Sequence, residues 1–323
     1  MGAYGPVDQR ILVTGGAGFI GSHLADSLVE NNDVRVLDSF TTGETSNVPD
    51  EANCIRGDIR NEGILERATD GVDLIYHQAG LVSVQRSIEE PSRSHEINVH
   101  ATLALLERAR ELDVRIVLAS SAAIYGHPEE VPITEDDPKE PRSPYGLEKL
   151  TIDHYARQYH ELYGLETVAL RYFNVYGPRQ AASDYSGAVS TFIEQAANDD
   201  PLTIHGGGTQ TRDFVFVDDV VRANLLAADT DRVGEAYNVG SGRSVAIREL
   251  AETAISVADA DSDLTFTDAR RGDVRHSEAD LEKSRTEIGY EPTVSLRQGL
   301  EQTINRPRGR IAIQQEMDDF SGR

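Results

Sequence analysis

The chain has 323 residues, 39% of them hydrophobic, and its 31 basic and 55 acidic residues give a formal net charge of −24. This length suffices for two domains or for one large domain with a lobe. The acidic balance disfavours nucleic-acid binding, because phosphate backbones need a basic surface. No apolar run approaches the roughly 18–20 residues that span a bilayer. The single cysteine, Cys54, excludes an intrachain disulfide and a cysteine metal cluster.

The excess of acidic residues accompanies a scarcity of lysine, since only Lys139, Lys149 and Lys283 occur. This composition is typical of extreme halophiles, whose acidic surface stays solvated when salt screens charges to within a few ångströms. An ordinary acidic enzyme is the alternative. The N-terminal residues lack the basic and apolar regions of a signal peptide, so we expect a cytoplasmic protein. With no membrane-spanning run and one cysteine, we expect it to bind neither membrane nor metal.

Short apolar runs alternate with helical patterns in the first half of the chain. The expected strands are Arg10–Thr14, Val34–Leu37, Ala52–Arg56, Leu74–Tyr76, Val114–Ala119 and Thr167–Leu170. The expected helices are Ile20–Glu30, Gly63–Ala68, Ser92–Glu111 and Pro144–Tyr163, the last with Ser143 as its N-cap. This alternation indicates βαβ units, so the sequence predicts an α/β fold with a doubly wound parallel (Rossmann) sheet.

The pattern changes after Gly177. A helix over Ala188–Asn198 and strands over Leu202–His205 and Phe214–Val217, separated by a glycine turn, predict a smaller α/β lobe interleaved with the last elements of the sheet. We expect a sheet domain over residues 1–175 and 212–240, a lobe over residues 176–211 and 241–305, and a mobile tail over residues 306–323.

A glycine-rich turn connects the first strand to the first helix, with the sequence Thr14-Gly15-Gly16-Ala17-Gly18-Phe19-Ile20-Gly21. Its glycines permit a tight turn, close approach of the backbone to a pyrophosphate, and close packing of helix on strand. The helix N-terminus offers N–H groups and partial positive charge to phosphates. A glycine motif alone is weak evidence, but the strand before it and the helix after it supply the context of a dinucleotide site.

Two aspartates follow the next strands. Asp38 ends the second strand, about twenty residues beyond the motif, where a carboxylate can bind both ribose hydroxyls and repel a 2′-phosphate. The sequence therefore favours NAD over NADP, although a turn or cap role for Asp38 is the alternative. Asp58 follows the third strand and can bind the adenine amino group or act as a turn residue.

Tyr145 and Lys149 form a Tyr-x-x-x-Lys pair on one face of a helix. Lowering a tyrosine pKa from about 10 to 7 needs roughly 4 kcal/mol, which a lysine ammonium together with a nicotinamide cation can supply. A surface helix pair is the alternative. The scarcity of lysine, the start of the helix at Tyr145, and Ser120-Ser121 at the end of the fifth strand favour a catalytic site.

Four motifs occur in a fixed order: Thr14–Gly21, Ser121–Gly126, Tyr145–Lys149 and Arg171–Gly177. With them the chain, from about Arg10 to Leu300, resembles the extended short-chain dehydrogenase/reductases, specifically the UDP-glucose/UDP-N-acetylglucosamine 4-epimerases. One departure is Gly80, which ends a His-Gln-Ala-Gly motif where relatives usually have alanine.

The resemblance implies that the sheet domain binds NAD and that the lobe binds the substrate. It implies a catalytic set in which Ser121 binds the sugar O4, Tyr145 moves its proton, and Lys149 orients the cofactor ribose. The implied cofactor site consists of Gly15, Gly18, Phe19, Ile20, Gly21, Asp38, Ser39, Thr42, Gly43, Asp58, Ile59, Gln78, Ala79, Asn98, Ser120, Tyr145, Lys149 and Tyr172. The implied nucleotide-sugar site consists of Ser83, Ser121, Asn174, Val189, Thr203, His205, Arg212, Arg270, Asp273 and Ser277.

The arginines have an independent rationale, since an acidic chain needs a local cation to bind a pyrophosphate. Salt bridges to surface carboxylates are their alternative role. Ala122 and Ala123 stand where dehydratases and decarboxylases of this family usually have an acidic residue, so we expect 4-epimerisation of a UDP-hexose. Ser277 stands where relatives limit the pocket around the sugar C2 substituent, and its small size predicts room for N-acetyl sugars.

Three rival functions stay open: a uronate or dTDP-sugar epimerase, a dehydratase or decarboxylase of the same family, and a non-catalytic NAD-binding scaffold. The helices over Ser92–Glu111 and Pro144–Tyr163 resemble those that pair two subunits in this family. We therefore expect a homodimer.

Overall fold

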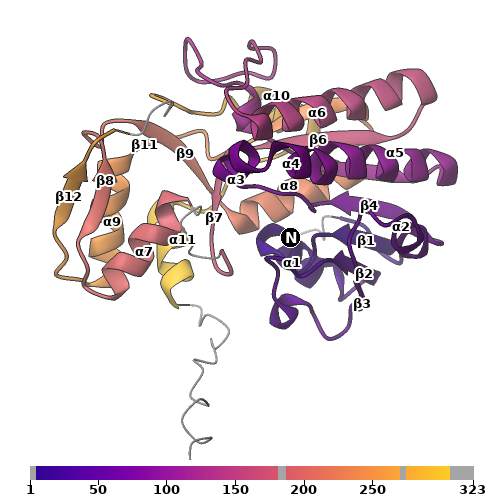
Figure 1. Cartoon of the computed structure of the whole chain (residues 1–323), viewed down its shortest axis with the longest axis horizontal. Coiled ribbons are helices and arrows are strands. Elements are labelled where there is room, and N and C mark those ends of the chain that lie inside the picture. Colours follow the sequence, from indigo (N-terminus) through magenta and orange to yellow (C-terminus); the bar gives the residue numbers. More distant parts are fainter. Residues whose placement is uncertain (1–4, 181–186, 270–273, 306–323) are drawn as a thin grey trace, which may run out of the picture.

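A seven-stranded parallel sheet forms the centre of the computed structural model, which describes residues 5–180, 187–269 and 274–305 (Figure 1). The strand order is β10-β6-β5-β4-β1-β2-β3. The strands are β1 (Arg10–Thr14), β2 (Asp33–Asp38), β3 (Asn53–Arg56), β4 (Leu74–His77), β5 (Arg115–Ser121), β6 (Thr167–Tyr172) and β10 (Glu235–Val239). The predicted doubly wound parallel sheet is confirmed.

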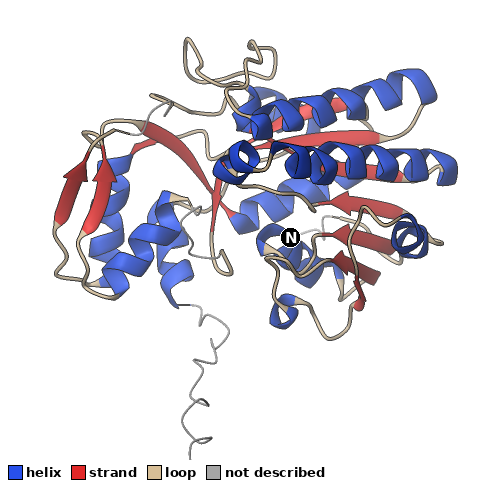
Figure 2. Ribbon diagram, in the orientation of Figure 1, coloured by secondary structure: helices blue, strands red, loops and turns tan. Residues whose placement is uncertain are grey.

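Helices cover both faces of this sheet (Figure 2). One face packs on α1 (Phe19–Leu28) and α8 (Val217–Asp229), and the other on α2 (Glu62–Thr69), α5 (Ala101–Leu112) and α6 (Pro144–Tyr163). Successive strand residues point to opposite faces, so Ile11 and Val13 join the first core while Leu12 joins the second. This two-sided burial explains why the strands are continuous apolar runs.

A smaller lobe holds a third core, formed by α7 (Ala188–Ala197), α9 (Ile247–Ala258), α11 (Leu296–Asn305) and two short sheets. One sheet has the order β11-β9-β7, with β7 (Asn174–Tyr176), β9 (Thr211–Phe216) and β11 (Ser244–Ala246). The other pairs β8 (Leu202–His205) with β12 (Leu264–Thr267). Because α8 and β10 return to the large sheet between β9 and β11, the lobe is interleaved with the sheet domain, as expected.

The remaining elements are α3 (Val84–Glu89), α4 (Pro91–His95), α10 (Glu282–Ile288), the π-helical segment η2 (Glu96–His100), and the 3₁₀ turns η1 (Thr45–Asn47) and η3 (Ala122–Ile124). The helix expected over Ser92–Glu111 is confirmed in its span, where α4, η2 and α5 follow one another without a gap and Glu96–His100 is π-helical. In the described part of the chain, no helix is both long and apolar enough to cross a membrane. The expected tail, residues 306–323, lies outside the described residues.

Candidate active site

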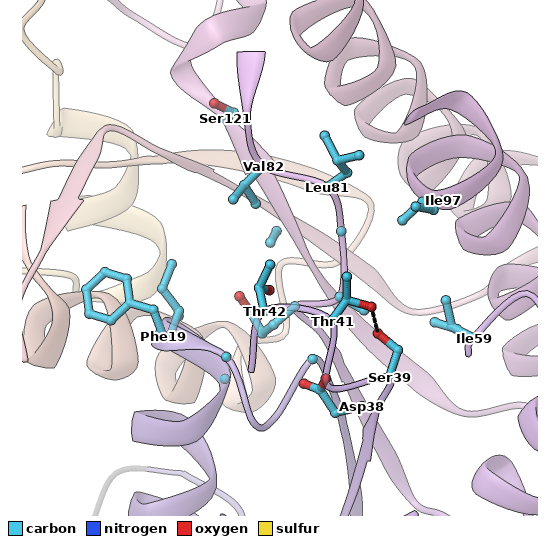
Figure 3. A pocket seen from close by; sticks show the side chains of 18 of the residues that line it. Phe19, Asp38, Ser39, Thr41, Thr42, Ile59, Leu81, Val82, Ile97 and Ser121 are labelled. Carbon is cyan, nitrogen blue, oxygen red and sulfur yellow. Dashed lines mark hydrogen bonds between the residues drawn. The ribbon is translucent and has the colours of Figure 1, made fainter. Parts of the chain in front are cut away.

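A cleft of about 430 Å³ opens at the carboxyl ends of the parallel strands, where the connecting loops of an open α/β sheet bind ligands (Figure 3). It is lined by residues that follow β1, β2, β3, β4, β5 and β6. Of the predicted cofactor residues, those lining the cleft are Gly15, Gly18, Phe19, Ile20, Gly21, Asp38, Ser39, Thr42, Asp58, Ile59, Gln78, Ala79, Ser120, Tyr145, Lys149 and Tyr172. Ser121 lines it as well.

The glycine-rich turn leaves no room for side chains. Gly15 has φ +70°, and a Cβ there would lie 2.7 Å from the backbone nitrogen of Ala79. A Cβ on Gly21 would lie 2.2 Å from the carbonyl oxygen of Gly15. Gly18 is the N-cap of α1, and Phe19, Ile20 and Gly21 of the first helical turn line the cleft. The free N–H groups of a helix N-terminus at this position suit a pyrophosphate.

Asp38 is held rigidly at the end of β2. One carboxylate oxygen accepts the N–H of Ala17 at 3.0 Å and the other accepts the N–H of Phe40 at 2.7 Å. Asp38 therefore orders its own turn, and because it also lines the cleft its contact with a ribose stays a prediction. A carboxylate fixed here suits a ribose with free hydroxyls and disfavours a 2′-phosphate.

Asp58 is tied to Arg60, whose guanidinium lies 2.6 Å from the Asp58 carboxylate and 3.1 Å from that of Glu96. The hydrogen bond from Arg60 holds the pKa of Asp58 below its ordinary value. Arg60 also lines the cleft, and Ile59 and Ile97 face each other beside it (Figure 3). Contact of Asp58 with adenine stays a prediction.

Ser121, Tyr145 and Lys149 converge at one end of the cleft. Ser143 caps α6 by accepting the N–H of Gly146 at 3.1 Å, and Pro144 begins the helix, as expected. The side chains of Tyr145 and Ser121 are hydrogen-bonded. Lys149 Nζ donates to the carbonyl of Ala119 at 2.7 Å and lies 5.9 Å from the centre of the Tyr145 ring.

Burial shifts the pKa values of the two titratable side chains at this end of the cleft, Tyr145 and Lys149. Burial raises the pKa of Tyr145, which the hydrogen bond with Ser121 only partly offsets, and Glu148 raises it further. Burial lowers the pKa of Lys149 to about 8. The expected lowering of the Tyr145 pKa depends on the lysine together with the nicotinamide cation, and it stays a prediction for the enzyme with its cofactor bound.

Hydrogen bonds fix the floor of the cleft behind β4. His77 Nδ1 bonds Thr14 Oγ1 at 2.7 Å, and Nε2 bonds Thr102 Oγ1 at 2.8 Å. Burial lowers the pKa of His77 to about 3, so the ring is neutral. Beside it, the Gln78 amide donates to Tyr172 Oη at 3.1 Å. Burial raises the pKa of Tyr172 to about 12, so this tyrosine is also neutral.

Three predicted residues support the cleft without lining it. A Cβ on Gly43 would lie 2.8 Å from the backbone of Ala17, so Gly43 packs against the glycine-rich turn. Asn98 is buried, and both of its amide atoms bond the backbone of Leu81. Ser83 caps α3 by accepting the N–H of Arg86 at 3.1 Å.

Most predicted nucleotide-sugar residues lie in the lobe, apart from the cleft lining. Asn174 Nδ2 donates to the carbonyl of Asp213 at 3.0 Å, between β7 and β9, and Arg212 lies next to it on β9. Val189 is buried in the core of the lobe. Thr203 and His205 lie on β8 and Ser277 is buried, whereas Arg270 and Asp273 lie outside the described residues.

Residues that the sequence-based prediction missed also line the cleft. They are Leu37, Thr41, Gly57, Arg60, Leu81, Val82, Arg86, Arg93, Ile97, Ala119, Phe173, Val175 and Gln180. Most of them stand at the end of a parallel strand or in the loop after it. That position was the signal that could have found them.

A protein-family model described as the NAD dependent epimerase/dehydratase family matches residues 11–240. The chain belongs to this family. The chain is 39% identical over 299 residues to a putative UDP-glucose 4-epimerase of Methanocaldococcus jannaschii, covering 91% of this chain and 97% of the relative.

Solved structures of family members superpose closely. A UDP-glucose 4-epimerase of Thermotoga maritima, solved with UDP-glucose, has a TM-score of 0.89 and 38% identity, over 91% of this chain and 97% of that one. A UDP-glucuronic acid 4-epimerase of Bacillus cereus, solved with UDP-glucuronic acid and NAD, has a TM-score of 0.83 and 33% identity, over 91% and 98%. The protein is thus an NAD-dependent enzyme of the nucleotide-sugar epimerase/dehydratase family, and its glycine turn and Asp38 fit that cofactor.

Proposed function

We propose that this family member is a UDP-hexose 4-epimerase that interconverts UDP-glucose and UDP-galactose, and the corresponding N-acetyl pair. The observation that carries the proposal is the convergence of Ser121, Tyr145 and Lys149 at one end of the cleft. The two residues that follow Ser121, Ala122 and Ala123, start the turn η3 and offer no acid or base. A site that oxidises C4 and has alanines directly after Ser121, where an acid or base would act further on the keto sugar, favours return of the hydride to the other face of the sugar.

The proposed chemistry divides among three side chains. When bound, NAD supplies the hydride acceptor and donor for C4. Ser121 hydrogen-bonds the sugar O4 and Tyr145, and Tyr145 takes the O4 proton and later returns it. Lys149 holds the cofactor ribose and, as an ammonium, favours the tyrosinate once the nicotinamide charge is present. Arg212 in the lobe, together with Asn174, binds the diphosphate, which leaves the sugar free to turn over.

The test is a product assay. Purified protein with NAD is incubated with UDP-glucose, UDP-galactose and both N-acetyl analogues, and the products are separated chromatographically. We expect interconversion within each pair and at least a hundredfold loss of kcat in Tyr145→Phe, the usual scale for a removed general base. No turnover of either pair, or intact turnover in Tyr145→Phe, would refute the proposal.

The acceptance of N-acetyl sugars rests on Ser277, which is buried with 8% of its surface exposed. We expect Ser277→Tyr to reduce activity on the N-acetyl pair much more than on UDP-glucose, because a bulky side chain there occupies space for the C2 substituent. Equal losses on both substrates would contradict this assignment.

Other family activities are the alternatives. The relative from Bacillus cereus acts on a uronic acid, and the same product assay run with UDP-glucuronic acid distinguishes that activity from hexose epimerisation. Release of carbon dioxide would indicate a decarboxylase, and a dTDP-sugar panel would detect a dTDP-sugar epimerase or dehydratase. A non-catalytic scaffold would bind NAD and turn over none of these substrates.

We also propose that the enzyme is a cytoplasmic homodimer. The apolar side chains Leu147, Leu162 and Tyr163 on α6 are 55–66% exposed, and Leu112 on α5 is 37% exposed. Pairing α5 and α6 with a second copy would bury them. A molar mass equal to that of one chain, measured by light scattering, would contradict the dimer. We keep as a proposal the domain division expected from the sequence, in which residues 1–175 and 212–240 bind NAD and residues 176–211 and 241–305 bind the substrate. Its boundaries differ from the strand pairing, because β7 and β9 lie in one sheet of the lobe.

A further inference from the structure

Glu148 is a buried carboxylate that the proposed chemistry does not use. It lies in α6 next to Lys149, and only 4% of its surface is exposed. Its Oε2 accepts two hydrogen bonds, from Ser94 Oγ at 2.6 Å and from Asn98 Nδ2 at 2.7 Å. Burying a carboxylate is costly unless its partners are well placed. A group at this depth, with two donors aimed at one oxygen, therefore indicates a positioning role.

Asn98 transmits this contact to the cofactor cleft. Its Oδ1 accepts the N–H of Leu81 at 2.7 Å, and its Nδ2 donates to the carbonyl of Leu81 at 3.0 Å. Leu81 lines the cleft (Figure 3). Asn98 itself lies in η2, and π-helical segments of this kind are frequent at functional sites. The Glu148 carboxylate thus orients an amide that holds both backbone groups of a cleft residue.

Gly80 shows how closely these parts are packed. A Cβ at Gly80 would lie 3.0 Å from Asn98 Oδ1 and 3.8 Å from Lys149 Nζ. The Asn98 side chain, the backbone of Gly80 and the Lys149 ammonium are therefore close neighbours at the wall of the cleft. Any rotation of the Asn98 amide would displace the segment that lines the cofactor site.

We propose that Glu148 is a positioning residue, which acts through Asn98 to hold the Gly80–Leu81 segment in the geometry that binds NAD. The role rests on the proposed function only in placing Lys149 in the active site. Binding of NAD, which the family membership already assigns, is the readout. Failure of the epimerase proposal would appear in the sugar assay, and failure of this one in the NAD titration.

Two variants at Glu148 test whether its hydrogen bonds affect NAD binding, and thermal unfolding measures any effect on stability separately. Glu148→Gln keeps an oxygen that accepts from Ser94 and Asn98, whereas Glu148→Ala removes the acceptor. Glu161→Ala is the matched control, since Glu161 is an exposed glutamate of the same helix. The NAD dissociation constant of the full chain is measured by calorimetric titration, and thermal unfolding of each variant is recorded beside it.

We expect Glu148→Ala to weaken NAD binding about tenfold, as loss of a hydrogen bond to a charged group would. Glu148→Gln should stay within about threefold of the parent, and Glu161→Ala should not differ from it. Asn98→Ala should weaken binding similarly, and the double variant Asn98→Ala/Glu148→Ala should be no weaker than the weaker single variant, because both act through one contact. An unchanged constant in Glu148→Ala, an equal loss in Glu148→Gln, or additive losses in the double variant would overturn the proposal.

Discussion

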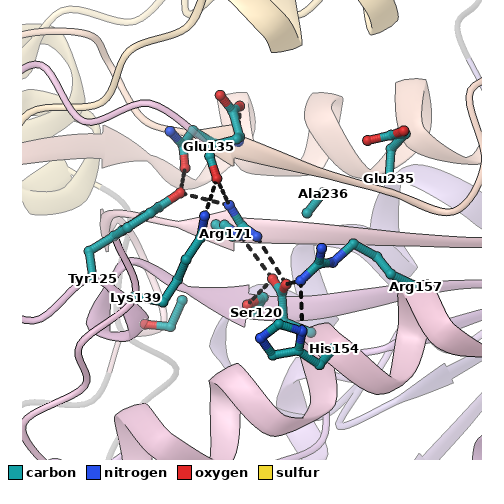
Figure 4. Close-up of polar contacts among 12 residues, drawn as sticks. Ser120, Tyr125, Glu135, Lys139, His154, Arg157, Arg171, Glu235 and Ala236 are labelled. Carbon is teal, nitrogen blue, oxygen red and sulfur yellow. Dashed lines mark hydrogen bonds and ion pairs between the residues drawn. The ribbon is translucent and has the colours of Figure 1, made fainter. Parts of the chain in front are cut away.

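The substitution Asp153→Asn hardly changes the shape of the side chain, yet we expect it to lower the free energy of unfolding strongly, because it removes a buried charge. Asp153 and Arg171 form a bidentate ion pair, with Nε–Oδ2 at 2.9 Å and Nη2–Oδ1 at 3.0 Å. Their side chains are 0% and 2% exposed. Ser120 Oγ also donates to Asp153 at 3.0 Å, and Arg171 donates to Tyr125 Oη at 2.9 Å (Figure 4).

The magnitude follows from the burial. In Asp153→Asn the guanidinium stays buried, yet it loses its counter-charge and one of the two carboxylate oxygens, and keeps Tyr125 Oη and the Glu135 carbonyl as acceptors. Breaking a buried pair by changing one partner costs about 3–5 kcal/mol, whereas an exposed pair contributes about 0–1 kcal/mol. Burial alone raises the pKa of Asp153, but the hydrogen bonds and charge of Arg171 outweigh it and leave that pKa below its ordinary value. The pair therefore stabilises the fold above about pH 4, the pKa of an unfolded aspartate, and this contribution is lost as pH falls through the lower folded pKa.

Urea unfolding at neutral pH and fixed salt concentration measures the effect. Glu140→Gln is the control, because it breaks an exposed ion pair. The side chains of Arg142 and Glu140 are 58% and 64% exposed. The double variant Asp153→Asn/Arg171→Met should be less destabilised than the sum of its single variants, since no fully buried charge is left without its partner. Arg157, which also pairs with Asp153 at 3.3 Å, is 36% exposed and stays solvated. A loss below about 1 kcal/mol in Asp153→Asn, with an unchanged slope against urea, would refute the reasoning from burial.

Four further outcomes are expected. Burial lowers the pKa of Lys149 to about 8, so NAD affinity should fall as pH rises through that value and the ammonium is lost; a flat profile, or an equal pH dependence in Lys149→Met, would contradict this. Asp38→Ser should reduce the preference for NAD over NADP at least about tenfold in paired titrations, because the carboxylate that repels a 2′-phosphate is gone; an unchanged ratio would leave Asp38 with its turn role alone. Gly21→Ala should abolish measurable NAD binding, since its Cβ would lie 2.2 Å from the Gly15 carbonyl; parental affinity in that variant would show that the turn relaxes freely. The unfolding temperature should rise with potassium chloride up to molar concentrations, because screening relieves repulsion within a net charge of −24; a salt-independent value would favour an ordinary acidic enzyme.

Local signals determined much of the fold. The helix predicted over Pro144–Tyr163 agrees with α6 to the residue, because Ser143, Pro144 and the left-handed Gly164 mark its ends. The motif Thr14–Gly21 predicted the tight turn between β1 and α1, since only glycine tolerates the contacts found at Gly15 and Gly21. Strands buried on both faces, such as β6, were also predicted from the sequence, because they are apolar runs. After Val217 such signals weaken, and strands like the largely exposed β12 carried no clear pattern.

Only the tertiary structure decided which distant side chains meet. Glu148 and Asn98 are 50 positions apart, Gln78 and Tyr172 are 94 apart, and no local pattern pairs them. The same holds for the charges of the site, because the pKa of Tyr145 depends on how deeply α6 is buried rather than on the nearby lysine alone. The π-helical segment within the helix expected over Ser92–Glu111 coincides with the contact of Asn98 to the loop after β4. Periodicity reports which face of an element is apolar, whereas the partners of a buried polar group depend on the folding of the whole chain.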